Sequence, residues 1–260
     1  MALADRLRAV FAPADAPRRS DWEGVYPSFA EVPAAGPGFA GEQWTKDTRA
    51  LTERAREELV PRPALAGDQA LLPMVAGMAA AAGNPLRILD FGGGLGVGYL
   101  QVAAALPRAS RIEYHIVETE RVCDEGARLY AGDARVRFHR SVPAGLRDID
   151  VLHVNSALQY VDDWRGLLAT LCGLEPRFVL LVRCSAGDTP TFATAQTTLQ
   201  GSRIPYWFLN LDELVGLLAG QGYMPRFVAR STVEFRQDGL PDRYRQRHPA
   251  NLLFSREAAR

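Results

Sequence analysis

The chain contains almost no lysine, few cysteines and no surplus of either charge. Lys46 is the only lysine among 30 basic residues, and 30 acidic residues balance them. Because no basic surplus is present, the composition does not indicate a nucleic-acid partner. The three cysteines, Cys123, Cys172 and Cys184, are too few and too widely spaced for a disulfide or zinc pattern. This usage suits a reducing compartment, so we expect a cytoplasmic protein.

The sequence also lacks a membrane span, a metal-ligand cluster and a nucleophile elbow. Its longest apolar stretch, residues 71–83, is too short to cross a bilayer, and residues 1–11 are amphipathic, unlike a signal peptide. No group of histidines and acids has metal-ligand spacing. With 260 residues and 47% hydrophobic content, the chain can still bury one large core. We therefore expect a domain with a small-molecule partner, no metal and no membrane association.

Strand and helix patterns alternate along the chain after residue 64. Helices are expected over residues 66–82, 96–106, 120–131, 162–173 and 210–221, and strands over 86–90, 111–117, 135–139, 149–154, 177–183, 223–234 and 250–255. This alternation predicts an α/β fold with a mostly parallel, seven-stranded sheet and helices on both faces. The last two strands have no helix between them, so they are expected to form an antiparallel closing pair. Residues 64–260 would make up this domain.

Residues 1–63 differ from the rest because prolines and aromatic residues are interspersed in them. Disordered tails contain few aromatics, so this segment is expected to pack on the α/β domain. A helix is predicted over residues 42–59, and Pro61 and Pro63 would end it. Two interpretations stay open, a lid over a ligand pocket or a purely structural N-terminal wrap.

The stretch from residue 86 to 98 predicts a buried strand, a turn without side chains and the start of a helix. The strand pattern ends at Asp90, and the turn contains Gly92, Gly93, Gly94, Gly96 and Gly98. Such a turn lets a ligand lie directly against the backbone, whereas a connector with no ligand would have little use for so many glycines. A dinucleotide fingerprint, G-x-G-x-x-G, would need a glycine at position 97 or 99, where Val97 and Tyr99 stand. A nicotinamide cofactor is therefore disfavoured.

The spacing of Asp90, Gly92, Gly94 and Gly96 resembles the D-x-G-x-G-x-G motif of class I S-adenosylmethionine (SAM)-dependent methyltransferases. SAM carries a sulfonium and an ammonium but no phosphate, so a carboxylate at the strand end suits its amino-acid portion. The resemblance implies a Rossmann-like fold, SAM as the cofactor and S-adenosylhomocysteine (SAH) as its product. It also implies that Gly93 lies at the cofactor.

Glu118 is the next acid at the end of a predicted strand, about twenty residues beyond the glycine turn. In nucleotide-binding α/β folds, an acid at this position accepts hydrogen bonds from ribose hydroxyls. Both hydroxyls are free in SAM, so we expect Glu118 to hold the ribose; a surface glutamate is the alternative. The adenine is expected near residues 139–141, with Ser141 as a contact, although no acid stands there for the adenine amino group.

The strand over residues 149–154 is followed by polar residues at the expected reaction centre. Ligands of open α/β sheets bind beyond the carboxyl ends of the strands, so Asn155 and Ser156 are expected at the cofactor, with Asn155 also in a catalytic role. Gln159 and Tyr160 are expected on the substrate side. Tyr160 would orient the nucleophile or help to remove its proton; packing beneath the next helix is the alternative.

Short elements along nearly the whole chain resemble a narrower group, assigned as methyltransferases and often encoded in bacterial polysaccharide gene clusters. They are Trp22-Glu-Gly-Val-Tyr26, the turn at residues 89–94, Leu158-Gln159-Tyr160, Arg183 and Pro205-Tyr206-Trp207. Substrate contacts are therefore expected from Trp22, Tyr26, Arg183, Tyr206 and Trp207. Arg183 would hold an anionic group, with a salt bridge as the alternative. Gln196, Tyr206 and Trp207 belong to a long connection, residues 184–209. Connections of this length are more often functional than idle, so these three residues are expected to contact the substrate.

The sequence thus predicts a SAM-dependent methyltransferase that acts on an oxygen or nitrogen nucleophile of a small molecule, such as a glycan or secondary-metabolite precursor. A catalytically silent SAM- or SAH-binding partner protein is the first alternative, and an NAD(P)-dependent oxidoreductase is the second. The lack of an evident strong base favours an amine, carboxylate or phenolic acceptor. The resemblance favours a sugar, so the acceptor stays open.

Overall fold

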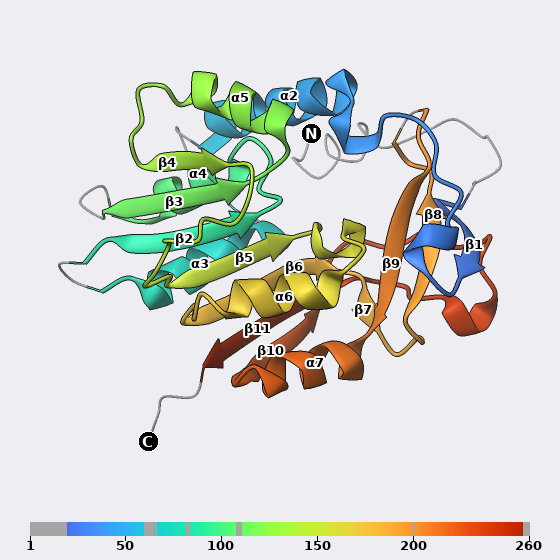
Figure 1. Ribbon diagram of the computed structural model, residues 1–260. Coiled ribbons are helices and arrows are strands. Elements are labelled where there is room, and N and C mark those ends of the chain that lie inside the picture. Colours follow the sequence, from blue (N-terminus) through green and yellow to red (C-terminus); the bar gives the residue numbers. More distant parts are fainter. Residues whose placement is uncertain are drawn as a thin grey trace, which may run out of the picture.

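The computed structural model describes residues 20–59, 65, 67–81, 84–107, 111–199 and 201–256, which form a large and a small sheet with helices around them (Figure 1). The helices are α2 (Glu42–Leu59), α3 (Leu71–Ala79), α4 (Val97–Ala105), α5 (Glu120–Leu129), α6 (Trp164–Cys172) and α7 (Leu211–Gly220). The strands are β1 (Trp22–Tyr26), β2 (Leu86–Phe91), β3 (Ile112–Val117), β4 (Val136–His139), β5 (Val151–Asn155), β6 (Phe178–Cys184), β7 (Ala186–Gly187), β8 (Phe192–Gln196), β9 (Ile204–Asn210), β10 (Tyr223–Arg230) and β11 (Ala250–Arg256). The amphipathic start at residues 1–11 and the helix stop at Pro61 and Pro63 lie outside the described residues.

The large sheet has the strand order β10-β11-β6-β5-β2-β3-β4. Strands β4, β3, β2, β5 and β6 are mutually parallel, whereas β11 pairs antiparallel with both β6 and β10. The predicted seven-stranded, mostly parallel sheet with an antiparallel closing pair is therefore confirmed. The sequence order also reverses between β5 and β2, so a ligand site is expected at the carboxyl ends of these two strands.

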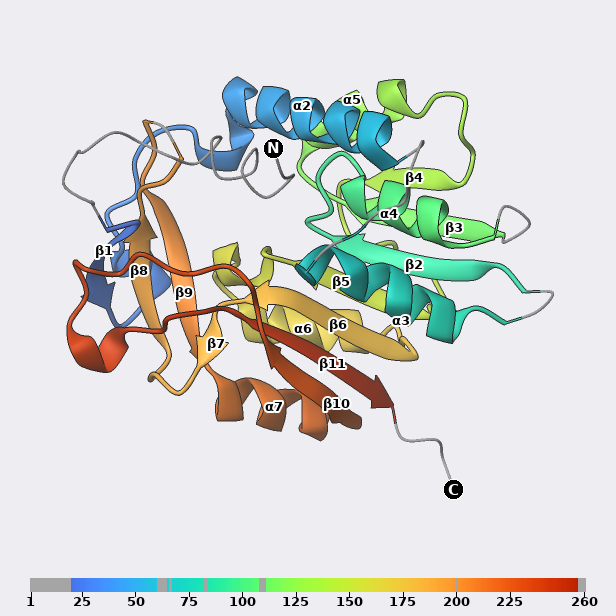
Figure 2. The ribbon, with the colours of Figure 1, turned by 180° about the vertical axis from the view of Figure 1, so that it is seen from behind.

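The core lies on both faces of this sheet because its central strands are apolar on both sides. Successive residues of a strand point to opposite faces, and Ile88 and Leu89 in β2 belong to different core clusters. Leu89 packs with residues of α6 and α7, and Ile88 packs with residues of α3 and α4. Figure 1 shows α6 and α7 in front of the sheet, and Figure 2 shows α3 and α4 on the opposite face.

The small sheet has the order β1-β8-β9-β7 and stands beside the carboxyl ends of the parallel strands (Figure 1). Three of its strands come from residues 184–210, which the sequence analysis described only as a long connection. Its remaining strand, β1, pairs antiparallel with β8 and so ties the N-terminal segment to this region. Four buried aromatics of this sheet pack in one cluster, Trp22, Phe192, Tyr206 and Phe208, whereas Trp207 belongs to the core of the large sheet.

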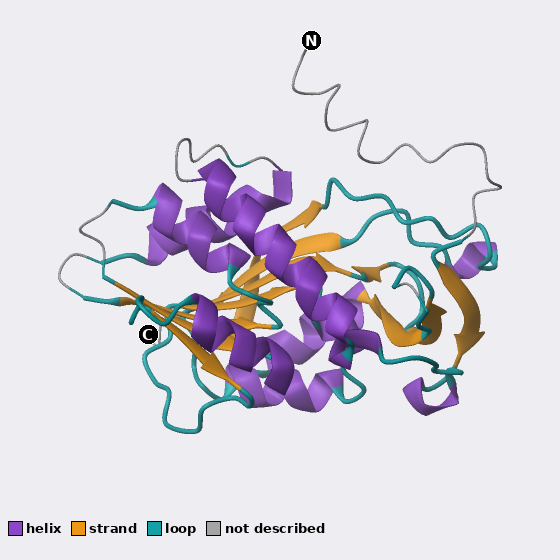
Figure 3. Cartoon of the chain, turned by 90° about the horizontal axis from the view of Figure 1, so that it is seen from above, coloured by secondary structure: helices purple, strands orange, loops and turns teal. Residues whose placement is uncertain are grey.

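Helix α2 runs along the top of the molecule in Figure 1 and contacts α4 and α5. Figure 3, seen from above, shows helices lying over the strands. It follows β1 and a short stretch of single 3₁₀ turns, so one continuous segment links the small sheet to the helices above β2 and β3. None of the helices that the structure describes is both long enough and apolar enough to span a membrane.

Candidate functional site

The turn between β2 and α4 is built around the buried carboxylate of Asp90, which is 1% exposed. The Tyr114 hydroxyl donates a hydrogen bond of 2.6 Å to its Oδ2, and Nδ1 of His153 lies 2.8 Å from its Oδ1. A Cβ on Gly93 would lie 2.6 Å from this carboxylate, and one on Gly98 would lie 2.4 Å from the Tyr114 oxygen. These two glycines therefore make room for the protein's own acid and phenol.

Gly92 serves a different purpose, because it lets the turn approach the segment that follows β5. Its φ of 69° is in the left-handed region, and a Cβ there would lie 2.4 Å from Cβ of Ala157. Only glycine avoids both the backbone strain and this clash. The carboxyl ends of β2 and β5 consequently meet at short range.

Glu118 follows β3 and reaches across to the glycine turn. Its carboxylate accepts hydrogen bonds from the backbone amides of Gly94, at 3.1 Å, and Thr119, at 2.8 Å. Burial raises the pKa of Glu118 above its usual value, although these two amides oppose the shift. Each carboxylate oxygen keeps further acceptor capacity for a ligand.

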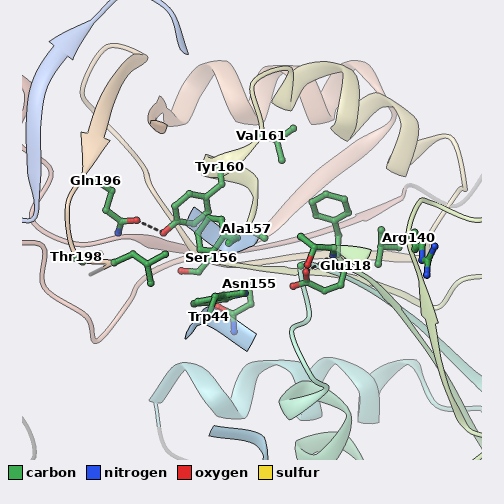
Figure 4. A pocket seen from close by; sticks show the side chains of 16 residues that line it. Trp44, Glu118, Arg140, Asn155, Ser156, Ala157, Tyr160, Val161, Gln196 and Thr198 are labelled. Atoms are coloured by element: carbon green, nitrogen blue, oxygen red, sulfur yellow. Dashed lines mark hydrogen bonds between the residues drawn. The ribbon is translucent and has the colours of Figure 1, made fainter. Parts of the chain in front are cut away.

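A cavity of about 540 Å³ lies at the carboxyl ends of β2, β3 and β5 and extends to the small sheet (Figure 4). Its lining brings together predicted site residues from four separate segments: Gly92, Glu118, Asn155, Ser156, Tyr160 and Gln196. It also includes residues that the sequence analysis did not single out: Phe39, Trp44, Phe91, Val117, Thr119, Arg140, Ala157, Val161, Thr198 and Leu199. The cavity at the switch point of the sheet therefore contains six of the predicted site residues in its lining.

Asn155 and Ser156 form the floor of this cavity where β5 ends. Ser156 has a φ of 54°, a left-handed conformation that is unusual for a residue with a side chain. Its amide donates to the carbonyl of Val182 in β6, which holds the strained turn against the neighbouring strand. Both polar side chains remain exposed beside the glycine turn.

Tyr160 and Gln196 join the two sheets across the cavity (Figure 4). The Tyr160 hydroxyl donates a hydrogen bond of 2.8 Å to Oε1 of Gln196. Desolvation by the surrounding rings raises the pKa of Tyr160, so its phenol stays protonated at neutral pH. The alternative that Tyr160 packs only beneath the next helix does not describe this arrangement, because its ring lines the cavity.

Phe39 and Trp44 come from the N-terminal segment and form the opposite side of the lining. The Phe39 ring meets Trp44 edge-on at 4.9 Å and Tyr160 edge-on at 4.7 Å. The sequence signal for them was the aromatic content of a proline-rich segment, which indicated packing but not a position. The contact of Phe39 with Tyr160 gives the N-terminal segment a place in the site.

The other predicted site residues do not line this cavity. These are Asp90, Gly93, Gly94, Gly96 and Ser141 from the cofactor set, and Gln159, Arg183, Tyr206, Trp207, Trp22 and Tyr26 from the substrate set. The Asp90 carboxylate is engaged with Tyr114 and His153, and Gly93 lies against it. Trp22 and Tyr206 are instead buried in the small sheet's aromatic core, and the Trp207 indole donates to the Asp162 carbonyl.

Arg183 illustrates why a charge at a strand end need not face a ligand. Its Nε lies 3.1 Å from the carboxylate of Asp68, which is 6% exposed. Asp68 also accepts from the Ser231 hydroxyl and the Asn251 amide. The guanidinium thus neutralises a buried acid, which matches the salt-bridge alternative for Arg183. The buried Gln159 similarly donates to the Arg183 carbonyl.

Comparisons with known proteins relate the chain to others through its fold. No family model and no curated protein matches the sequence. Among solved structures, the chain is similar to 1,6-didemethyltoxoflavin-N1-methyltransferase of Burkholderia thailandensis, crystallised with 1,6-didemethyltoxoflavin and SAH. The two share 18% identity over 89% of this chain and 94% of the other, with a TM-score of 0.52. It is also similar to the CcbJ methyltransferase of Streptomyces caelestis, with 15% identity, 74% and 91% coverage and a TM-score of 0.51. The chain therefore has the Rossmann-like fold of the class I methyltransferases.

Proposed function

We propose that the chain is a SAM-dependent methyltransferase that moves a methyl group to an oxygen or nitrogen atom of a small molecule. The observation that supports this most is the position of Glu118. Its carboxylate stands at the carboxyl end of β3, lines the cavity and is hydrogen-bonded to the glycine turn of β2. A ribose with two free hydroxyls suits an acceptor in this place.

The residues at the switch point fit SAM in further respects. The left-handed Gly92 keeps the floor of the cavity free of a side chain, and Asn155 and Ser156 offer polar groups beside it. We assign the cofactor to this part of the cavity, with Ser141 and Arg140 on the side expected for the adenine. Asp90 stabilises the turn and does not contact the cofactor directly in this proposal, since both of its carboxylate oxygens have partners within the protein.

When bound, SAM supplies a methyl group on a positively charged sulfur, so the transfer needs little chemistry from the protein. The chain's own residues would align the acceptor and exclude water, which is the larger part of the catalytic task. Tyr160 is protonated and donates to Gln196, so it orients groups around the acceptor and does not remove a proton. The Burkholderia enzyme of similar fold was crystallised with SAH and a small molecule, which supports a small-molecule acceptor for this chain.

Titration calorimetry tests the cofactor assignment. SAH should bind the purified protein with one site per chain, and NADPH should give no heat at the same concentrations. Heat with NADPH and none with SAH would overturn the proposal.

A catalytically silent SAM-binding protein is the second candidate, and one observation favours it. Among the described residues of the lining, the titratable side chains are Glu118, Arg140 and Tyr160, and none of them is a ready base at the substrate side. Transfer of a labelled methyl group from SAM into any acceptor distinguishes the enzyme from this candidate.

A further inference from the structure

The end of the cavity away from Glu118 is dominated by aromatic and apolar side chains. This acceptor end, as we define it, is lined by Phe39, Trp44, Tyr160, Gln196, Thr198 and Leu199. Figure 4 shows Gln196, Tyr160 and Thr198 together on the side opposite Glu118 and Arg140. The charged residues of the lining are thus collected at the other end, where the cofactor is assigned.

The rings at the acceptor end offer flat surfaces rather than a set of hydrogen-bonding groups. Phe39 stands nearly perpendicular to both neighbours, with interplanar angles of 71° to Trp44 and 82° to Tyr160. Aromatic rings gain most from planar, apolar partners placed against their faces and edges. A sugar carries hydroxyl groups all around its ring, and most of these would lose hydrogen bonds to water here, because the lining offers few polar partners.

One polar group at this end has a definite direction. Oε1 of Gln196 accepts the Tyr160 hydroxyl, and its Nε2 has no hydrogen-bond partner among the described residues. The Tyr160 bond therefore orients the amide so that its N–H donors remain available. Such a donor suits an electron-rich oxygen or nitrogen at the edge of an otherwise apolar molecule.

The proton of the acceptor imposes a second chemical limit. Within the described lining, Glu118 is engaged with two backbone amides, Arg140 is a cation, and the pKa of Tyr160 is raised. An aliphatic hydroxyl needs a strong base to become a nucleophile, whereas a phenol, an enol or an acidic ring N–H can release its proton to water. The site therefore selects acceptors that ionise without help.

We infer that the acceptor is a planar, uncharged aromatic or heteroaromatic molecule with an acidic hydroxyl or ring N–H group. This inference rests on the proposed function. The acceptor's proton passes to water, and a lone pair on its oxygen or nitrogen forms the new bond to the methyl carbon. The carbon–sulfur bond breaks, and its electron pair stays on sulfur, which becomes the neutral thioether of SAH. The Gln196 amide donates to the acceptor atom or its neighbour on the ring.

The experiment uses the full chain, SAM with a labelled methyl group and probes of defined chemistry. The probes are 1-naphthol as a flat acidic hydroxyl, lumazine as an acidic ring N–H, and methyl β-D-glucopyranoside as an aliphatic hydroxyl. We expect labelled product from an aromatic probe and none from the glucoside. Methylation of the glucoside, or SAH binding with neither binding nor methylation of the aromatic probes, would overturn the inference and leave the proposed function intact. Loss of SAH binding itself would instead count against the proposed function.

Variants then test how the acceptor end recognises the probe, with binding measured at saturating SAH. Gln196→Leu should weaken 1-naphthol binding about tenfold, because the amide donor is removed and no new acceptor for the phenol hydroxyl is added, and it should leave naphthalene binding unchanged. Phe39→Ala should weaken both probes about tenfold, and Phe39→Leu, which keeps apolar volume, should have a smaller effect. Phe29→Ala is the matched control, because Phe29 stacks on Trp207 outside the cavity lining. Equal loss in the Phe29 and Phe39 variants, with SAH binding retained, would contradict the proposed position of the acceptor.

Discussion

Gly94 and Glu118, 24 residues apart in the sequence, are joined by a hydrogen bond of 3.1 Å from the Gly94 amide to the Glu118 carboxylate. This bond links the two features that the sequence analysis assigned to one ligand, the glycine turn after β2 and the acid after β3. The geometry places both at the rim of one cavity, and the following predictions test what each contributes.

Replacing Glu118 by Ala should weaken SAH binding by about 1–3 kcal/mol, because a charged hydrogen-bond acceptor for the ribose is lost. Titration calorimetry measures the change directly. Glu57→Ala is a suitable control, since Glu57 is an exposed residue of α2 outside the cavity lining. Unchanged SAH affinity in Glu118→Ala would remove Glu118 from the site.

The affinity for SAH should fall as the pH is lowered from neutral towards 5. Burial, together with the nearby Asp90, raises the pKa of Glu118, whereas the Thr119 and Gly94 amides lower it; the net shift is upward. The carboxylate therefore becomes protonated at a higher pH than a free glutamate, and the protonated form is the poorer acceptor. Calorimetry at pH 7 and pH 5 should show this loss in the native chain, and a flat profile in Glu118→Gln. Parallel profiles in the two proteins would show that another group titrates.

Gly92→Ala should destabilise the protein by about 1–3 kcal/mol, through a positive φ and a clash with Ala157. Because the same clash displaces the end of β5, SAH affinity should fall as well. Gly132→Ala makes the matched comparison, since nothing lies within 4 Å of a Cβ at Gly132. Urea unfolding and SAH titration of the two variants should differ clearly; equal behaviour would mean that the turn tolerates the added methyl group.

Arg183→Met should lower the free energy of unfolding by about 1–3 kcal/mol, because the buried Asp68 loses a charged partner. SAH affinity should stay the same, since Arg183 does not line the cavity. Urea denaturation and calorimetry on one protein preparation separate the two effects. A large loss of ligand affinity with unchanged stability would return Arg183 to the substrate set.

Tyr114→Phe should cost about 1–3 kcal/mol of stability, because it removes the hydroxyl that donates to the buried Asp90 carboxylate. Tyr223→Phe is the comparison, since its buried hydroxyl donates only to the neutral carbonyl of Pro176. Hydrogen bonds to charged groups contribute more, so Tyr114→Phe should lower the urea midpoint further. The reverse order would indicate that Asp90 does not depend on Tyr114.

The helices and strands predicted for the large sheet agree with the structure in type and order because they rest on local signals, although the helix expected over residues 66–82 begins as a 3₁₀ turn and is α-helical only over Leu71–Ala79. A local pattern of apolar and polar residues is enough to predict the strand before Asp90, the helix after Gly96 and the closing pair of strands near the C-terminus. Strand β9 was missed although residues 206–209 form an unbroken apolar run, because its segment was assigned to the long connection. Strands β7 and β8 were missed because β7 has only two residues and β8 contains small residues and a threonine. Such strands are specified by pairing with one another and not by their own pattern.

Some site residues could likewise be predicted from local sequence, whereas others depend on contacts with distant parts of the chain. Glu118, Asn155 and Ser156 could be found from the sequence, since in parallel α/β sheets the residues after successive strands gather at one edge. Arg183 could not be placed, because its partner Asp68 is 115 residues away and nothing near either residue records the contact.

The sequence by itself determined the order of strands and helices in the large sheet, the side-chain-free turn and the acid opposite it, because spacing along a few residues decides each of them. Only the tertiary structure decided what surrounds the acceptor. Pairing of β1 with β8 anchors the N-terminal segment, and this brings Phe39 within 4.7 Å of Tyr160 and places Gln196 against the Tyr160 hydroxyl. Those contacts join residues far apart in the chain, and they exist because burying aromatic surface between the two sheets stabilises the closed arrangement.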